Sequence, residues 1–268
     1  MPLAGDRCLR SDHSSFAQCT RCHVSDPIQA ASDVAKATEE VAKTAGQVVE
    51  ATTRLGTFVA RYIGGPLQLA SGIVEDKLKY MRWENQVDLM ARADRKLAQI
   101  GLPSPTRTIP PKFAVPLLQA ASLEDDADIR DLWATLLVNA ANADSGIDLS
   151  AAYISILRDL TPLDARILRT IYALPFGEMH HQGVFTGYLP ERAIICPEGG
   201  RRSSENPEPS NDVRLSLANL ARLGCLTLTR TMGGGEMMDS VNPTYLGSFF
   251  VAACTLSCRS DSTGSSGS

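Results

Sequence analysis

Aromatic side chains are scarce in this sequence: Phe, Trp and Tyr together make up 6% of its 268 residues. Single-stranded nucleic acids are often held by stacking bases on aromatic rings, and few such rings are present here. No lysine follows Lys112, and the formal net charge is −4. Sequence-independent binding to nucleic acid depends on many Lys and Arg contacts with phosphates. The composition therefore argues against such binding.

The sequence also lacks the usual catalytic motifs. It contains no nucleophile elbow, no P-loop lysine, no dinucleotide fingerprint and no H-E-x-x-H. Glu178, His180 and His181 could supply metal ligands, but adjacent histidines point in different directions on a helix, so we interpret "EMHHQ" as a surface turn. We therefore expect a protein that is not an enzyme and that has no catalytic residues, no metal and no cofactor.

An apolar run of the length of a secretory signal is missing from residues 1–25, which predicts a cytoplasmic protein. Its seven cysteines are then expected to be reduced. The segment "CTRCH", Cys19–His23, matches the attachment pattern of c-type haem, and with Cys8 and His13 it could form a zinc knuckle. Haem attachment needs export, and the zinc spacing is loose. We therefore interpret residues 1–25 as a disordered extension.

Residues 55–74 are long enough to cross a bilayer and contain Arg61 as their only charge. The glycines and proline at Gly64-Gly65-Pro66 interrupt the helix that a membrane span requires. This favours a buried corner between two helices. The alternative is a membrane-acting effector, in which Phe58, Tyr62 and Leu67 would contact lipid.

Heptad spacing extends over residues 29–63 and predicts one long helix. Small residues fill half of its core positions, so it needs a partner helix from this chain or another. The seam runs through Val34, Val41, Val48, Leu55 and Tyr62. A second helix is expected at residues 73–100. Together they form a long-helix module at residues 26–102, and the four prolines of residues 103–111 predict a stiff linker after it.

The acidic segment "SLEDDAD" lies between two apolar helical patterns in residues 112–160, where we expect a helical hairpin and a connecting helix. Pro110 and Pro111 suit the start of the first helix. The acids could form a metal or acid–base site, but no histidine is nearby. Carboxylates at the start of a helix also accept hydrogen bonds from the unpaired backbone N–H groups there. We therefore interpret the segment as the start of the second helix.

Residues 161–256 predict a winged-helix-like α+β module. "TPLDARIL" resembles a capped helix start, with Thr161 as cap and Asp164 three residues later. A loop follows at 187–211, then a helix, a β-hairpin around "GGG" at 233–235 and a closing helix. Arg214 and Arg222 are the candidate DNA contacts, but acidic side chains outnumber basic ones in this half. We expect residues 257–268 to be a disordered tail.

The predicted fold class is thus mainly α, an N-terminal helical module followed by a C-terminal winged-helix-like α+β module. Several segments, in this order, resemble the abortive infection alpha (Abi-alpha) family of bacterial proteins. They include "GGPLQLASGIVEDKLKYMRWENQ", "IPPKFAVPLLQAASLEDDADIRDLWATLLVNA", "LRDLTPLDARIL", "VRLSLANLARLGCL" and "TYLGSFFVAAC". The resemblance covers residues 27–256.

This resemblance implies a role in phage defence, in which an infected cell stops growing or dies before phage are released. The resemblance assigns no catalytic residues to this sequence. We expect the protein to act through a protein partner or by self-association. A winged-helix regulator that binds DNA is the alternative, and the membrane effector is a third possibility. The phage component that would act as trigger is not indicated by the sequence.

Overall fold

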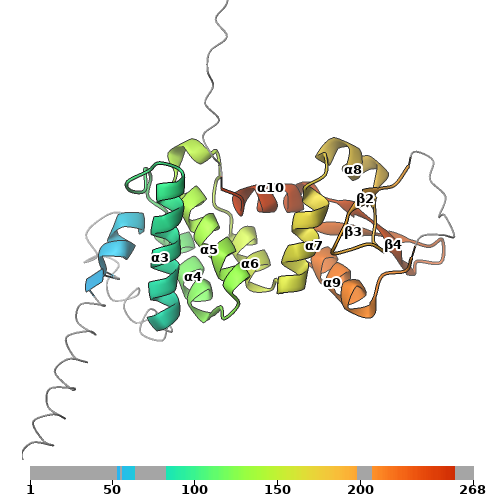
Figure 1. Ribbon diagram of the computed structural model, residues 1–268, viewed down its shortest axis with the longest axis horizontal. Helices are drawn as coiled ribbons and strands as arrows, with labels where there is room; N and C mark the ends of the chain where they lie inside the picture. The colour runs from blue at the N-terminus through green and yellow to red at the C-terminus, as the bar shows by residue number, and fades with distance from the viewer. Residues whose placement is uncertain (1–52, 55, 64–82, 198–206, 257–268) are drawn as a thin grey trace, which may run out of the picture. The chain divides into compact units, whose positions relative to one another are not determined.

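The computed structural model describes residues 53–54, 56–63, 83–197 and 207–256 (Figure 1). All of these belong to the second of the two units into which the chain divides, Thr52–Ser268. The predictions for residues 1–25, the metal-ligand candidates in them, most of the heptad seam, Leu67 and the tail at 257–268 lie outside the described residues.

The helical part is built around α3 (Trp83–Gln99), α4 (Pro111–Leu123) and α5 (Ala127–Ala140), with α3 packed against both others (Figure 1). A 3₁₀ turn, η1 (Ala143–Ser145), and α6 (Ala151–Arg158) follow. The buried face of α5 supplies the centre of the core, where Trp133, Leu136 and Leu137 are at most 1% exposed. The helical segment 56–63 adds Phe58, Val59 and Tyr62 to the same core.

Helices α4 and α5 begin at the residues that the local sequence predicts. Pro110 and Pro111 stand at the start of α4. Asp126 caps α5, because its Oδ1 accepts hydrogen bonds from the backbone N–H groups of Asp128 and Ile129 at 2.9 and 3.0 Å. Glu124 Oε1 accepts from the Asp126 N–H at 2.9 Å. The prediction that the acidic segment is the start of a helix is therefore confirmed.

Residues 103–111, where a stiff linker was expected, make hydrogen bonds with the helices on both sides. The Thr106 and Arg107 N–H groups donate to Ala141 O at 3.0 Å, and the Ile109 N–H donates to Tyr62 O at 2.7 Å. The Ile109 side chain is 1% exposed. Helix α3 before this segment and helices α4 and α5 after it therefore share one core.

The C-terminal module begins with α7 (Pro162–Tyr172) and α8 (Phe176–Gln182). Its sheet has four strands in the order β2-β1-β4-β3, all antiparallel. The strands and remaining helices are β1 (Val184–Phe185), β2 (Ile194–Ile195), α9 (Asn211–Arg222), β3 (Leu226–Arg230), β4 (Glu236–Pro243) and α10 (Tyr245–Ala253). Val184 and Leu228 both pair with Val241 of the central strand β4.

The predicted fold class, mainly α with a C-terminal α+β module, is confirmed. The predicted hairpin around the glycines at 233–235 and the closing helix are present as β3, β4 and α10. The prediction of a surface turn at His180 and His181 is wrong, because both lie in α8. The predicted loop at 187–211 also contains the strand β2.

A buried carboxylate joins α7 to α9. Thr161 and Asp164 form the predicted capping box of α7. Asp164 is also fully buried, and it accepts hydrogen bonds from Ser216 Oγ and, at 2.8 Å, from Asn219 Nδ2 of α9. Because a buried carboxylate is costly unless its oxygens are hydrogen-bonded, this second set of bonds fixes α9 against the first turn of α7.

Helix α10 lies in close contact with its neighbours because Gly247 has no side chain. A Cβ atom at Gly247 would lie 2.1 Å from Tyr172 Oη and 2.5 Å from Cys225 O. The Tyr172 hydroxyl donates to Cys225 O at 2.7 Å and accepts from the Thr244 N–H at 3.0 Å. At the other end of α10, Asn139 Nδ2 of α5 donates to Ala253 O at 2.9 Å. Both ends of α10 are therefore fixed.

Replacing the cap of α5 tests whether the acidic segment acts through hydrogen bonds or through charge. We expect Asp126→Ala to lower the free energy of unfolding by about 0.5–2 kcal/mol, because two backbone N–H groups lose their acceptor. Asp126→Asn keeps an oxygen acceptor and should cost much less. Urea denaturation of both variants measures the difference. Equal losses would show that charge, rather than the cap, matters.

Substitution at Gly247 tests the close approach of α10. We expect Gly247→Ala to lower the free energy of unfolding by about 1–3 kcal/mol, since the new methyl group must displace Tyr172 or the backbone. Gly177→Ala in α8 is the matched control, because nothing lies within 4 Å of a Cβ there. Thermal unfolding should show a loss only for the first variant. Equal melting temperatures for the two variants would contradict the packing argument.

Candidate interaction surface

Helix α10 contains no charged residue, although one side of it is exposed to solvent. Phe250 and Ala253 face the core, whereas Tyr245 and Phe249 are 60% and 58% exposed. A helix that is apolar on all sides is normally buried. The exposed side of α10 is therefore the feature of the described residues that most resembles an unoccupied interface.

Rings from α8 extend this surface beside α10. The ring centroid of Tyr245 lies 5.1 Å from that of Phe176 and 5.0 Å from that of His180, and Phe176 and His180 stack at 5.1 Å. The ring centroid of His181 lies 5.2 Å from that of His180, and the ring centroid of Phe249 lies 6.4 Å from that of Tyr245. We call these five residues the aromatic face.

Hydrogen bonds below the rings hold the aromatic face in position. His180 Nδ1 lies 2.7 Å from Pro243 O, and since a carbonyl oxygen can only accept, Nδ1 carries the proton. Asn242 Nδ2 donates to His180 O at 3.2 Å. Burial raises the pKa of Tyr172 to about 12, so its hydroxyl stays protonated and donates to Cys225 O. The face is thus preorganised.

The chemistry of the aromatic face suits protein binding. Its exposed rings offer apolar area with little conformational entropy to lose, which is typical of the residues that dominate protein interfaces. His181 and the polar edges of His180 and Tyr245 can add directional hydrogen bonds. Local sequence patterns do not reveal this face, because its two helices are separated by more than 60 residues. The spacing of Tyr245 and Phe249 was the one local signal.

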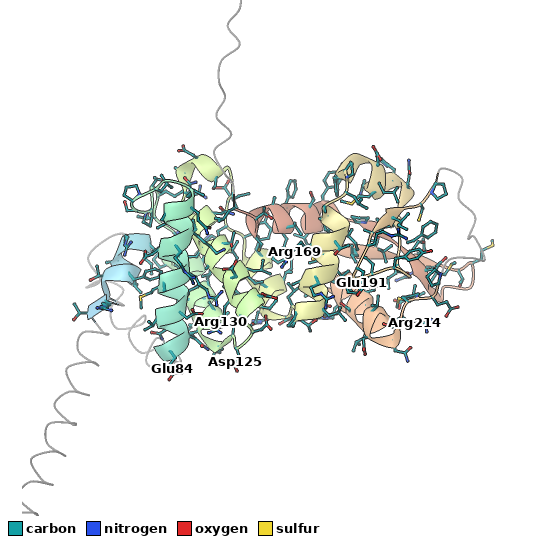
Figure 2. All side chains as sticks on the ribbon, in the orientation of Figure 1. Glu84, Asp125, Arg130, Arg169, Glu191 and Arg214 are labelled. Carbon is teal, nitrogen blue, oxygen red and sulfur yellow. The ribbon has the colours of Figure 1, made fainter. Side chains whose placement is uncertain are left out.

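Both arginines proposed for DNA contact are engaged with acidic residues. Arg214 pairs with Glu208 near the start of α9 (Figure 2). Arg222 lies 3.4 Å from an Asp159 carboxylate oxygen and 2.8 Å from Asn219 Oδ1. Hydrogen bonds from Arg158 and from Arg222 lower the pKa of Asp159, so this carboxylate is charged at neutral pH.

The proposed membrane contacts Phe58 and Tyr62 are 2% and 0% exposed and lie in the helical core. Arg61 between them forms an ion pair with Asp94 at 3.0 Å, with 34% of its side chain exposed. Leu67 lies outside the described residues. No helix within the described ranges is long and apolar enough to cross a membrane.

Metal-ligating and nucleophilic groups are dispersed in the part of the chain that the structure describes. That part contains no cluster of three or more His, Cys, Asp or Glu side chains able to hold a metal ion. Cys196, Cys225 and Cys254 are buried, and burial raises the pKa of each thiol, that of Cys225 to about 12. These cysteines are thus neutral thiols that pack in the core.

Comparison with known proteins gives one match. The family model described as "Abortive infection alpha" matches residues 84–254, which is more than half of the chain and includes the elements from α3 to α10. Searches of curated proteins and of solved structures found no match. The matched range contains the aromatic face and the capped helix starts at Asp126 and Thr161. This chain therefore belongs to the abortive infection alpha family.

Proposed function

We propose that this protein acts in phage defence as a cytoplasmic, non-enzymatic member of its family, and that it works through a protein partner bound at the aromatic face. Membership of the abortive infection alpha family supports the general role. The mode of action is our inference from the surface chemistry of the described residues.

The observation that carries the proposal is the exposure of Tyr245 and Phe249 on a helix without charge. Apolar side chains scattered singly on a surface are ordinary, but here five rings form one connected cluster. Charged residues are depleted and aromatic residues enriched in the centres of protein interfaces. The partner should therefore present an apolar surface with few charges.

The environment of the polar groups supports binding rather than catalysis. The Asp164 carboxylate accepts hydrogen bonds from side chains of α9, and His180 Nδ1 is hydrogen-bonded to Pro243 O. The thiols are held in the neutral form by burial. A catalytic acid or nucleophile would need a free position next to a substrate cavity, and these groups are used to hold the fold together.

A phage challenge tests the proposal. Cells with the wild-type gene should form fewer plaques than cells without it, and infected cells should stop growing before phage are released. We expect Tyr245→Ser combined with Phe249→Ser to abolish this protection, because truncating interface rings costs about 2 kcal/mol or more at each hot spot. Leu215→Ser on α9 is the control, since Leu215 is 73% exposed and lies outside the face.

The result can be separated from misfolding. Both variants change exposed side chains, so their circular dichroism spectra and melting temperatures should equal those of the wild type. Full protection by a folded double variant would refute the role of the aromatic face. Absence of protection by the wild type against every phage tested would refute the defence function itself.

A DNA-binding regulator is the second candidate. It is favoured by the order of β1, β4 and β3 and by the position of α9 before the β3–β4 hairpin, which follow the outline of a winged helix. Arg214 and Arg222 would then contact phosphates. Their carboxylate partners and the acidic balance of this half of the chain count against it.

We expect no tight binding of generic duplex DNA. Phosphate contacts by several basic residues would make the affinity fall steeply between about 50 and 200 mM salt, by a factor of about 10³ or more. An anisotropy titration of labelled duplex with the full chain should show weak binding and a shallow salt dependence. Nanomolar binding whose affinity falls steeply with salt concentration would contradict our proposal and favour the DNA-binding regulator.

A further inference from the structure

We propose that the open cavity lined by α3, α5, α7 and α10 binds a small amphipathic anion, with an apolar body and one carboxylate, phosphate or sulfonate group. The cavity is separate from the aromatic face, and the inference does not depend on the proposed function. It follows from the cavity's size, from the composition of its walls and from one arginine whose side chain has no partner among the described residues.

The cavity has a volume of about 530 Å³. Sites for small molecules in proteins usually measure about 300–1,000 Å³ and are lined by apolar groups with a few polar groups that fix orientation. Sixteen residues line this one, from α3, from α5, from α7 with Leu160 just before it, and from α10 with the residues after it. It thus lies where the helical part meets the C-terminal module.

The inner walls of the cavity are apolar. Leu132 of α5, Leu168 of α7, and Phe250 and Val251 of α10 contribute side chains to it. Cys254 also lines the cavity, and because burial raises the pKa of its thiol, it is uncharged and belongs with the apolar walls. An apolar ligand body would bury surface against these residues.

The polar side of the cavity holds charges of both signs. Lys96 Nζ lies 2.7 Å from Asp131 Oδ2. Arg92 lies 2.8 Å from Asp88 and 3.4 Å from Asp131, and it also donates to Ala127 O at 3.1 Å. These two cations are therefore neutralised, and both are held in fixed positions.

Arg169 differs from the other cations of the cavity. Arg169, labelled in Figure 2, lies in the last turn of α7 and lines the cavity, yet its guanidinium has neither a hydrogen bond nor an ion pair with the described residues. The lining contains three basic side chains, Arg92, Lys96 and Arg169, and two acidic ones, Asp128 and Asp131. Because Asp88 and Asp131 already pair with Arg92 and Lys96, Arg169 is the lining cation whose guanidinium can bind an anion with two hydrogen bonds.

Asp128, whose carboxylate has no ion pair among the described residues, determines which way a ligand would lie in the cavity. Asp128 lines the cavity on α5, and Arg169 lines it on α7. An anionic group is repelled by Asp128 and attracted by Arg169, so the charged end of the ligand should lie beside α7 with its apolar body against α10. The lining contains no histidine and no acidic thiol. The ligand is therefore bound and not transformed.

Calorimetric titration of the full chain with 1-anilinonaphthalene-8-sulfonate, an apolar ring system with a single sulfonate, tests the proposal. We expect saturable binding of one probe per chain. Octanoate and octyl phosphate should displace the probe, and whichever does so at the lower concentration identifies the preferred anionic group. Octanol, which has the same chain length without a charge, should displace it poorly.

Variants locate the site. Arg169→Gln should weaken probe binding by about five- to tenfold, the loss expected for an exposed charge-assisted contact, and Arg169→Lys should restore part of it. Arg166→Gln is the matched control on the same helix, because Arg166 lies outside the cavity and its ion pair with Glu191 spans 3.8 Å. Val251→Trp should fill the cavity and abolish binding, with a melting temperature close to that of the wild type.

Three outcomes would overturn the proposal. The first is no saturable binding by the wild type. The second is equal affinity of the Arg169→Gln and Arg166→Gln variants. The third is unchanged binding by folded Val251→Trp protein. If the Val251→Trp variant does not fold, the proposal is tested by the probe affinities of the Arg169→Gln and Arg166→Gln variants. Since no phage is present in these experiments, their failure would leave the defence assay unaffected.

Discussion

The close contact between Gly247 and Tyr172 is the interaction on which both candidate sites depend. It lets α10 approach α7 until the Tyr172 hydroxyl can bond the backbone at Cys225 and Thr244. Asn139 holds the opposite end of α10 through Ala253 O and, at 2.7 Å, Thr255 O. With both ends fixed, the helix presents Tyr245 and Phe249 to solvent and directs Phe250 and Val251 toward the cavity.

Buried polar groups in this protein connect elements that are distant in sequence. Asn139 connects α5 to α10, and Asp164 connects α7 to α9. Each such group must keep its partners, since an unsatisfied buried donor or acceptor costs about 1–3 kcal/mol. These bonds make the relative positions of the helices specific. Asn139 and Asp164 thus hold helices together through these hydrogen bonds.

The two candidate sites use different kinds of surface. The aromatic face is built from the rings of α8 and α10, and its proposed partner would be recognised by apolar area and shape. The cavity on the other side of α10 combines apolar walls with an unpaired guanidinium, which suits a smaller ligand. Helix α10 contributes to both. The phage assay and the titration examine them separately, with control residues, Leu215 and Arg166, that belong to neither.

Features whose interactions span three or four residues can be predicted from the amino-acid sequence alone. The cap of α5 at Asp126, the capping box of α7 at Thr161 and the prolines at the start of α4 satisfy the nearest backbone groups, so local spacing predicts them. The β3–β4 hairpin can also be predicted from the sequence, because its strands are joined by glycines that favour a turn.

Features that depend on contacts between distant segments become visible once the chain is folded. Strands β1 and β2 are two residues each, too short to show a period, and they exist because β4 supplies a partner for β1. The bonds from α9 to Asp164, the meeting of α8 with α10 and the cavity at Arg169 join side chains from separate helices. Local hydrophobic patterns show which face of a helix is buried, but they do not show what it is buried against.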